Sequence, residues 1–325
     1  MNKFESFLAR QLEQYVIYRH KLGYAMKASL SHLKTFDRYL RQKQAQEVLL
    51  PPSFFMGLQA NLKIEARSIN NIVASVRVFF NYLVRTGAYN KNPLKDIPYL
   101  PENDIMPFIF TPEQVNLLLS AVSARIRKVS RGKYLMDLSC YMAVVLLARC
   151  GLRISEPLRL KTIDYRFDEK TIYIEKTKFK KDRLIPLPRS AATELENYLA
   201  VRRRLLADVD NKYLLANYTG RGLNDNRVRL VFHRALSDIG LDQPRQVIGN
   251  LNISCPTPHI LRHSFAVNTL SSVKKRGGCA QNALPVLAVY MGHRDYQYTV
   301  KYLKVLDAYQ RLGLVNFVRT HPHQP

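Results

Sequence analysis

Residues 291–302 read Met-Gly-His-Arg-Asp-Tyr-Gln-Tyr-Thr-Val-Lys-Tyr, so a Gly-His pair precedes the final tyrosine by nine residues. Two earlier stretches add polar groups: His259-Ile-Leu-Arg-His263 lies shortly before this segment, and Gly151-Leu-Arg-Ile-Ser-Glu156 lies far upstream. A tyrosine hydroxyl can act as a nucleophile, and arginine side chains bind phosphate oxygens through paired hydrogen bonds. The three stretches therefore predict attack on a phosphodiester without a metal ion.

The run Thr257-Pro258 is typical of a helix start, with threonine as the cap and proline at the first helical position. His259 and Arg262 are then expected on one face of the first turn, beside backbone N–H groups that favour an anion. A metal pair formed by His259 and His263 is the competing interpretation. It is disfavoured because Leu261-Arg262 stands where a zinc protease has its glutamate, and a cation repels a metal ion.

A short helix is predicted just before the tyrosine. Pro285 can open it and Gly292 can terminate it. Tyr302 then falls about two turns into the segment that follows. Tyr296 and Tyr298 are rivals for any role that a tyrosine plays there.

Composition limits the class of protein. The chain has 325 residues, which fits two domains that each bury a core. Residues 1–100 carry 15 basic and 6 acidic side chains and the remainder carries 35 and 19, for a net charge of +25. We expect a polyanionic partner that touches both parts. The four cysteines form no close zinc-binding pair, and no stretch has the roughly 20 apolar residues of a membrane span. A soluble cytoplasmic protein without a cofactor is expected.

Residues 1–97 are predicted to form a helical domain, because apolar positions recur there at three- and four-residue steps. Ser68 is expected to cap a helix that runs from Ile69 to Thr86. The prolines of residues 98–110 block helix and predict an extended linker. A second domain over residues 111–325 is expected to begin with Thr111 as a helix cap.

One β-hairpin is predicted in the second domain. Thr171–Glu175 and Arg183–Leu187 are β-prone runs, joined by a lysine-rich turn. Such a turn is often merely solvated. Beside arginines and a tyrosine, however, one of its lysines becomes a candidate proton donor. Lys178 is the choice from the match to the hairpin of the family named below, and Lys176 is the alternative.

The order and spacing of these motifs resemble the tyrosine recombinase (phage integrase) family, of the mobile-element or Xer-like type. Residues 68–93, a helix followed by a turn and Asn-Pro, look like the end of that family's core-binding domain. The resemblance implies a mainly α fold with a small β-hairpin or sheet (α+β), built from a helical core-binding domain and a catalytic domain. Residue by residue it implies assisting roles and one nucleophile: Arg153, Lys178, His259, Arg262 and His293, with Tyr302 as the nucleophile. Pro157 departs from the small aliphatic residue expected after Glu156.

The chemistry can also be reasoned from the side chains. At pH 7 roughly one tyrosine in a thousand is ionised, so attack by Tyr302 needs help, which His259 can give by taking the proton. Arg153 and Arg262 can hold the non-bridging oxygens and stabilise the charge on phosphorus. Lys178 can protonate the leaving sugar oxygen. His293 can hold a phosphate oxygen or position the nucleophile, while His263 is expected to support the site or the core.

The leading hypothesis is a site-specific DNA recombinase or integrase that cleaves and rejoins double-stranded DNA through a 3'-phosphotyrosyl bond. It needs neither metal nor ATP, and acts as a homo-tetramer on paired sites, alone or with a related recombinase. A type IB topoisomerase shares this chemistry but relaxes supercoils as a monomer. A DNA-binding regulator with an inactive site is a third hypothesis, which does not account for the tyrosine. The target site, and the choice among integration, transposition, inversion and dimer resolution, stay open.

Overall fold

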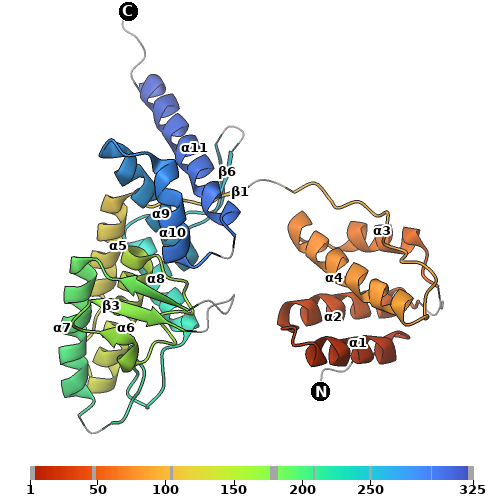
Figure 1. Ribbon diagram of the computed structural model, residues 1–325, viewed down its shortest axis with the longest axis horizontal. Coiled ribbons are helices and arrows are strands. Elements are labelled where there is room, and N and C mark those ends of the chain that lie inside the picture. The colour runs from red at the N-terminus through yellow and green to blue at the C-terminus, as the bar shows by residue number, and fades with distance from the viewer. Residues whose placement is uncertain are drawn as a thin grey trace, which may run out of the picture. The chain divides into compact units, whose positions relative to one another are not determined.

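The computed structural model describes residues 4–45, 49–102, 105–175, 182–207, 209–248, 251–293 and 295–320. The chain forms two compact units, Met1–Asn103 and Asp104–Pro325. In Figure 1 the first unit is coloured red to orange and the second yellow to blue. No helix among the described residues is long and apolar enough to cross a membrane.

Among its described residues, the first unit has four helices around an aromatic core. They are α1 (Ala9–Lys21), α2 (Lys27–Gln42), α3 (Pro52–Asn61) and α4 (Ala66–Arg85). Phe36, Phe55, Phe79 and Phe80 are fully buried and pack through ring contacts. Helices were expected here from the apolar periodicity. The expected cap was wrong: α4 begins two residues before Ser68, at Ala66, and Glu65 precedes it without a side-chain cap.

The segment expected as a linker makes contacts inside each unit. The amide of Gln59 donates to the carbonyl of Pro98, and Asn70 donates to the carbonyl of Leu100, both within the first unit. In the second unit, the backbone N–H of Phe110 donates to the Ser264 hydroxyl. The described prolines of this segment therefore lie in stretches that are hydrogen-bonded within one unit or the other.

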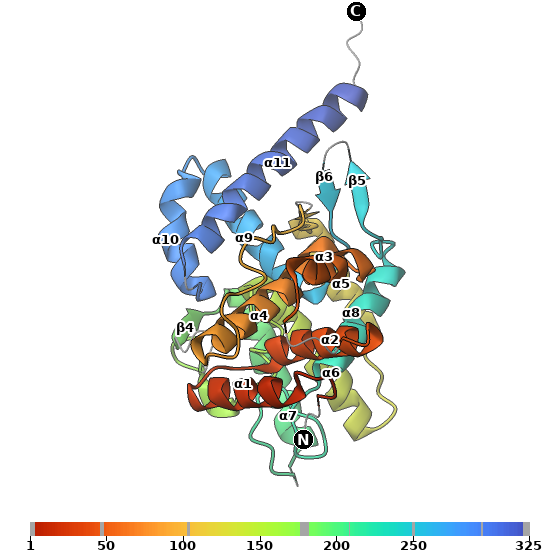
Figure 2. The same cartoon turned by 90° about the vertical axis from the view of Figure 1, so that its right-hand side faces the viewer.

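The described part of the second unit packs helices around one central buried helix and adds two small sheets. Its elements are β1 (Ile105–Met106), α5 (Pro112–Ala124), α6 (Arg131–Cys150), η1 (Thr162–Asp164), β2 (Tyr165–Arg166), β3 (Thr171–Ile174), β4 (Arg183–Pro186), α7 (Arg189–Leu205), α8 (Asp225–Asp238), β5 (Gln246–Ile248), β6 (Leu251–Ile253), α9 (Pro258–Lys275), α10 (Ala280–Met291) and α11 (Gln297–Thr320). Helix α6 contacts α5, α7, α8 and α9, because it is apolar on nearly all sides. Helices α9, α10 and α11 contact one another (Figure 1, Figure 2).

The predicted hairpin is present. Strands β3 and β4 pair antiparallel with Ile174 opposite Arg183, and β2 completes this sheet as β2-β3-β4. The second sheet, β1-β6-β5, was not predicted; β1 pairs parallel to β6, and β5 pairs antiparallel to it. The prediction of a mainly α fold with a small β element is confirmed.

The starts of two helices, α5 and α10, were predicted from capping residues and from proline at the first helical position. Helix α5 begins at Pro112 as expected, with Thr111 and Gln114 forming a reciprocal capping box. Pro285 was expected to open helix α10, but the helix begins at Ala280. The reason is packing: Leu284, Leu287 and Met291 lie on one buried face, and burying it outweighs the hydrogen bond that the proline removes.

Candidate active site

Arg153 is placed by the turn that ends α6. Gly151 adopts a left-handed conformation (φ 59°), and a Cβ there would lie 2.4 Å from the ring of Phe265. Beyond this turn, the backbone N–H and the Nη1 of Arg153 both donate to the Glu156 carboxylate, at 2.8 and 2.9 Å. Glu156 therefore orients the arginine.

Arg262 lies in the first turns of α9 and is only 2% exposed. Its Nη1 donates to the carbonyl of Gly151 at 2.8 Å, and its Nη2 donates to the carbonyl of Met291. Burial, reinforced by the nearby charge of Arg153, lowers the pKa of Arg262 to about 10, so the side chain stays cationic at pH 7. A guanidinium has five N–H donors, and these two bonds use one from each terminal nitrogen.

Helix α9 begins at Pro258 as predicted, although the Thr257 side chain makes no capping hydrogen bond. The rings of His259 and His263 meet edge to face at 4.9 Å, and the ring of His263 lies 5.5 Å from that of Tyr302. Burial lowers the pKa of both histidines, that of His263 to about 4. Both are therefore neutral at pH 7, which leaves a ring nitrogen able to accept a proton.

His293 follows the turn that ends α10, where Gly292 adopts a left-handed conformation (φ 62°) as expected. The Nδ1 of His293 and the hydroxyl of the fully buried Thr299 lie 2.8 Å apart. Burial, together with the charges of Arg262 and Arg153, lowers the pKa of His293 to about 4. A neutral imidazole is thus held in a fixed orientation.

Tyr302 lies in α11 and is 5% exposed. Burial raises its pKa above the usual 10, although the charges of Arg262 and Arg153 act in the opposite direction. Its rivals Tyr296 and Tyr298 are 45% and 52% exposed. Of the three tyrosines, Tyr302 is the one whose ring contacts both His263 and His293.

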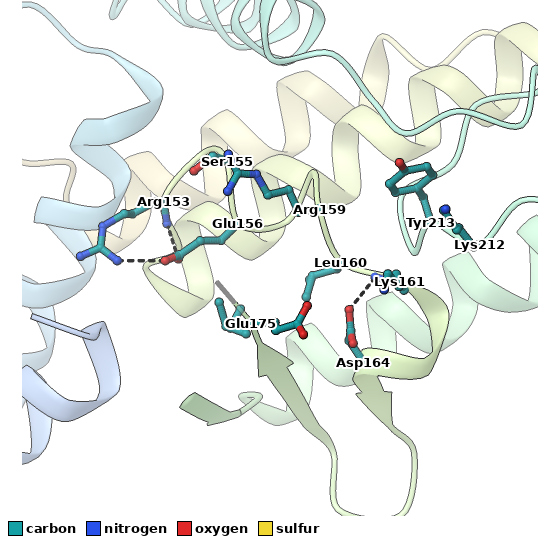
Figure 3. Close-up of a pocket in the computed structure, with 11 residues that line it drawn as sticks. Arg153, Ser155, Glu156, Arg159, Leu160, Lys161, Asp164, Glu175, Lys212 and Tyr213 are labelled. Atoms are coloured by element: carbon teal, nitrogen blue, oxygen red, sulfur yellow. Dashed lines mark hydrogen bonds and ion pairs between the residues drawn. The ribbon is translucent and has the colours of Figure 1, made fainter. Parts of the chain in front are cut away.

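A pocket of about 510 Å³ opens beside Arg153 and Glu156. Figure 3 shows Arg159 and the pair Lys212 and Tyr213 around it, with Glu175 at the end of β3. The segment that contains Lys178 and Lys176 lies outside the described residues. It connects β3 to β4, and Glu175, which precedes it directly, lines this pocket.

Two residues of this cluster were not predicted to belong to a site. Arg183 donates to both oxygens of Glu156, and Thr299 pairs with His293. Arg183 had been assigned only to a β-prone run, and Thr299 carried no sequence signal. The first is recognisable only once the strand register places its side chain inward.

The model of the phage integrase family matches residues 109–308. A protein of Sinorhizobium fredii named as an integrase/recombinase, y4rE, is 29% identical over 309 residues, which is 93% of each chain. Tyrosine recombinase XerD of Listeria monocytogenes is 27% identical over 264 residues, which is 79% of this chain and 80% of its own.

Solved structures of low sequence identity share the fold. A lambda integrase (75-356) dimer bound to a COC' core site matches with a TM-score of 0.67 at 16% identity, over 90% of this chain and 94% of that one. The XerH site-specific recombinase bound to palindromic difH substrate matches with a TM-score of 0.64 at 18% identity, over 85% of this chain and 75% of that one. The family model covers more than half of the sequence, with the arginine, histidine and tyrosine motifs inside it. The chain belongs to the phage integrase family, the tyrosine recombinases.

Proposed function

We propose that this protein is a site-specific DNA recombinase that breaks and rejoins strands through a 3'-phosphotyrosyl intermediate. The observation that carries the proposal is the position of Tyr302. Its phenol contacts two neutral histidines inside a cluster that contains two buried or half-buried arginines. These are the parts needed to attack a phosphodiester and stabilise its transition state.

In the proposed step the Tyr302 oxygen bonds to phosphorus while the bond from phosphorus to the 5' sugar oxygen breaks. Because burial raises the pKa of Tyr302, the phenol is protonated at pH 7 and must lose its proton during attack. His259 is the proposed acceptor of that proton; its ring meets that of His263, which in turn contacts Tyr302. His293 holds the nucleophile or a phosphate oxygen. The phosphotyrosyl bond conserves the energy of the broken linkage, so a second DNA end can reverse the step without ATP.

Arg153 and Arg262 stabilise the charge that builds on the non-bridging oxygens. Each is held by hydrogen bonds to protein groups, which fixes the direction of its remaining N–H donors before DNA binds. Two permanent cations supply the electrostatic role that a divalent metal has in other phosphoryl-transfer sites. We therefore propose a reaction that proceeds in the presence of a chelator.

Lys178 is the proposed acid for the leaving 5' oxygen, with Lys176 as the alternative. The supporting observation is that β3, which precedes its segment, ends at the pocket beside Arg153, and that β4, which follows it, begins at Arg183, a hydrogen-bond partner of Glu156. Lys178→Ala should slow cleavage strongly on ordinary DNA and recover on a 5'-phosphorothiolate, whose sulfur leaves without protonation. Rescue of Lys176→Ala alone would transfer the role to Lys176.

We further propose that both units bind double-stranded DNA and that the active assembly is a homo-tetramer on paired sites. A net charge of +25, with excess basic residues in both parts of the sequence, supports contact with DNA along the chain. A lambda integrase tetramer bound to a Holliday junction is among the structures of this fold. The domain roles assigned to residues 1–97 and 111–325 belong to this proposal.

The test uses the full chain and a duplex selected from a random library for binding to it. The duplex is then nicked at successive positions, so that cleavage near a nick releases a short fragment and traps the adduct. We expect a denaturant-resistant protein–DNA adduct in EDTA and without ATP. Binding without any adduct would support the regulator hypothesis. Relaxation of a plasmid that lacks the selected site would support the topoisomerase hypothesis.

A further inference from the structure

Three successive backbone carbonyls at the end of α10 each accept a hydrogen bond from a different arginine. The Nε of Arg183 donates to Tyr290 at 2.9 Å, Arg262 donates to Met291, and the Nη2 of Arg153 donates to Gly292 at 3.2 Å. The last carbonyls of a helix lack partners within it, and its C-terminal end carries partial negative charge. Three arginine side chains therefore meet at the end of α10, directly before His293.

Arg183 differs from the other two arginines because its three nitrogens all bond inside the protein. Its Nη1 and Nη2 donate to the two oxygens of Glu156, at 3.1 and 2.9 Å, while its Nε holds the Tyr290 carbonyl. Its side chain and that of Glu156 are each 7% exposed. Because all three of its side-chain nitrogens already bond to protein groups, Arg183 can act on a substrate only through its neighbours.

The neighbours of Arg183 are the groups that position Arg153 and His293. Glu156 also accepts from the backbone and side chain of Arg153, so Arg183 and Arg153 share one carboxylate. A Cβ on Gly292 would lie 3.0 Å from the Nη1 of Arg183, so this side chain also packs directly against the turn that leads to His293.

Arg183 is also the first residue of β4, where the lysine-rich connection rejoins the sheet. A single side chain thus joins the base of that hairpin, the carboxylate that orients Arg153 and the end of α10. We propose that Arg183 is a positioning residue for phosphoryl transfer, which holds Arg153 through Glu156 and the His293 turn through the Tyr290 carbonyl. This inference rests on the proposed function, because it concerns the same site.

The test compares Arg183→Met and Arg183→Lys in the full chain with Arg166→Met as the matched control. Arg166 lies on β2 of the same sheet and pairs with Glu169 at the surface, where both side chains are 51% exposed. Each variant reacts in a single turnover with two nicked duplexes. One carries an ordinary phosphodiester at the cleaved position, and the other a methylphosphonate, which lacks the charge that Arg153 opposes.

A misplaced Arg153 should cost about 100-fold in cleavage of the phosphodiester, the usual scale for a displacement of about 1 Å at a reacting group. We expect that loss for Arg183→Met with binding changed less than about threefold, and less than about tenfold loss on the methylphosphonate. Arg183→Lys keeps the charge but loses the paired geometry, so it should show the same pattern more weakly. Arg166→Met should react like the wild type on both duplexes.

Equal slowing on the two duplexes would assign Arg183 to general stability and overturn the inference. So would wild-type rates in both Arg183 variants. If Arg183→Met does not fold, as judged by circular dichroism, Arg183→Lys carries the comparison. Failure of the proposed function is distinguishable, because the wild-type chain itself would then form no adduct on either duplex.

Discussion

The imidazole of His293 stacks on the phenol ring of Tyr302, with ring centroids 6.0 Å apart and 28° between the planes. The same imidazole is fixed at its edge by Thr299, whose hydroxyl lies 2.8 Å from Nδ1. Thr299 is one turn before Tyr302 on the same helix. Helix α11 therefore supplies both the proposed nucleophile and the group that orients its histidine.

Replacing Thr299 should show whether its hydroxyl orients His293 or its side chain only fills space. Thr299→Val keeps the shape but leaves the buried Nδ1 of His293 without its partner, which should cost about 1–3 kcal/mol of stability. We expect cleavage to slow by about tenfold or more, as for loss of a group that orients a ligand side chain. Thr299→Ser restores the hydroxyl and should restore the rate. Equal rates in the valine and serine variants would remove this role from Thr299.

Substitution of Gly292 should cost more stability than substitution of a glycine that has a similar backbone conformation but open space around it. Gly292→Ala adds both the strain of φ 62° and a contact 3.0 Å from Arg183, whereas Gly240→Ala adds only the strain of φ 67°. We expect Gly240→Ala to cost about 1 kcal/mol and Gly292→Ala at least about 2 kcal/mol, with slower cleavage in the second alone. Chemical denaturation measures the first quantity. Identical losses would show that the arginine contact contributes nothing.

Removing the Glu156 carboxylate should cost far more stability than removing a carboxylate at the surface. Burial acts to raise the pKa of Glu156, but hydrogen bonds from the Arg183 side chain and the Arg153 backbone, together with the charges of Arg183 and Arg262, hold the pKa below its usual value. Glu156→Ala leaves buried guanidinium charge unpaired and should cost about 3–5 kcal/mol, whereas Glu156→Gln keeps part of the hydrogen bonding and should cost less. Glu169→Ala, which breaks a surface pair, should stay within about 0.5 kcal/mol in the same denaturation experiment.

Stability should fall on mild acidification because of the buried histidines. Burial lowers the pKa of His263 and His293 from 6.5 to about 4. Between these values the unfolded chain binds protons that the folded chain does not, so the free energy of unfolding decreases as pH falls below 6.5. Chemical denaturation at pH 6.5 and pH 5 measures how steeply the free energy of unfolding changes with pH, above the pH range in which most carboxylates titrate. His263→Gln should reduce the slope, and an unchanged slope would contradict a neutral, buried His263.

The sequence predicted the helices of the first unit, the β3–β4 hairpin and the end of α10, because periodicity and a helix-terminating glycine are local signals. It also predicted which side chains would gather, and the structure brings Arg153, His259, Arg262, His293 and Tyr302 into one cluster. Lys178 lies outside the described residues and stays a prediction.

Other features could not be derived from local patterns. The role of Arg183 depends on three segments far apart in the chain meeting at one carboxylate and one helix end. The extra turn of α10 before Pro285 depends on burial of Leu284, which a rule about proline alone does not include. The sheet β1-β6-β5 consists of strands of two or three residues, too short for a visible alternation.

The identity of the nucleophile is tested most directly by locating the nucleotide on the trapped adduct. Trypsin cuts after Lys301, which separates Tyr302 from Tyr296 and Tyr298, and fragment ions in mass spectrometry place the modified residue. We expect the nucleotide on Tyr302, and no adduct from Tyr302→Phe, which should still bind the duplex within about threefold, whereas Tyr298→Phe should form the adduct normally. A nucleotide on Tyr298, or an adduct that persists in Tyr302→Phe, would contradict the account.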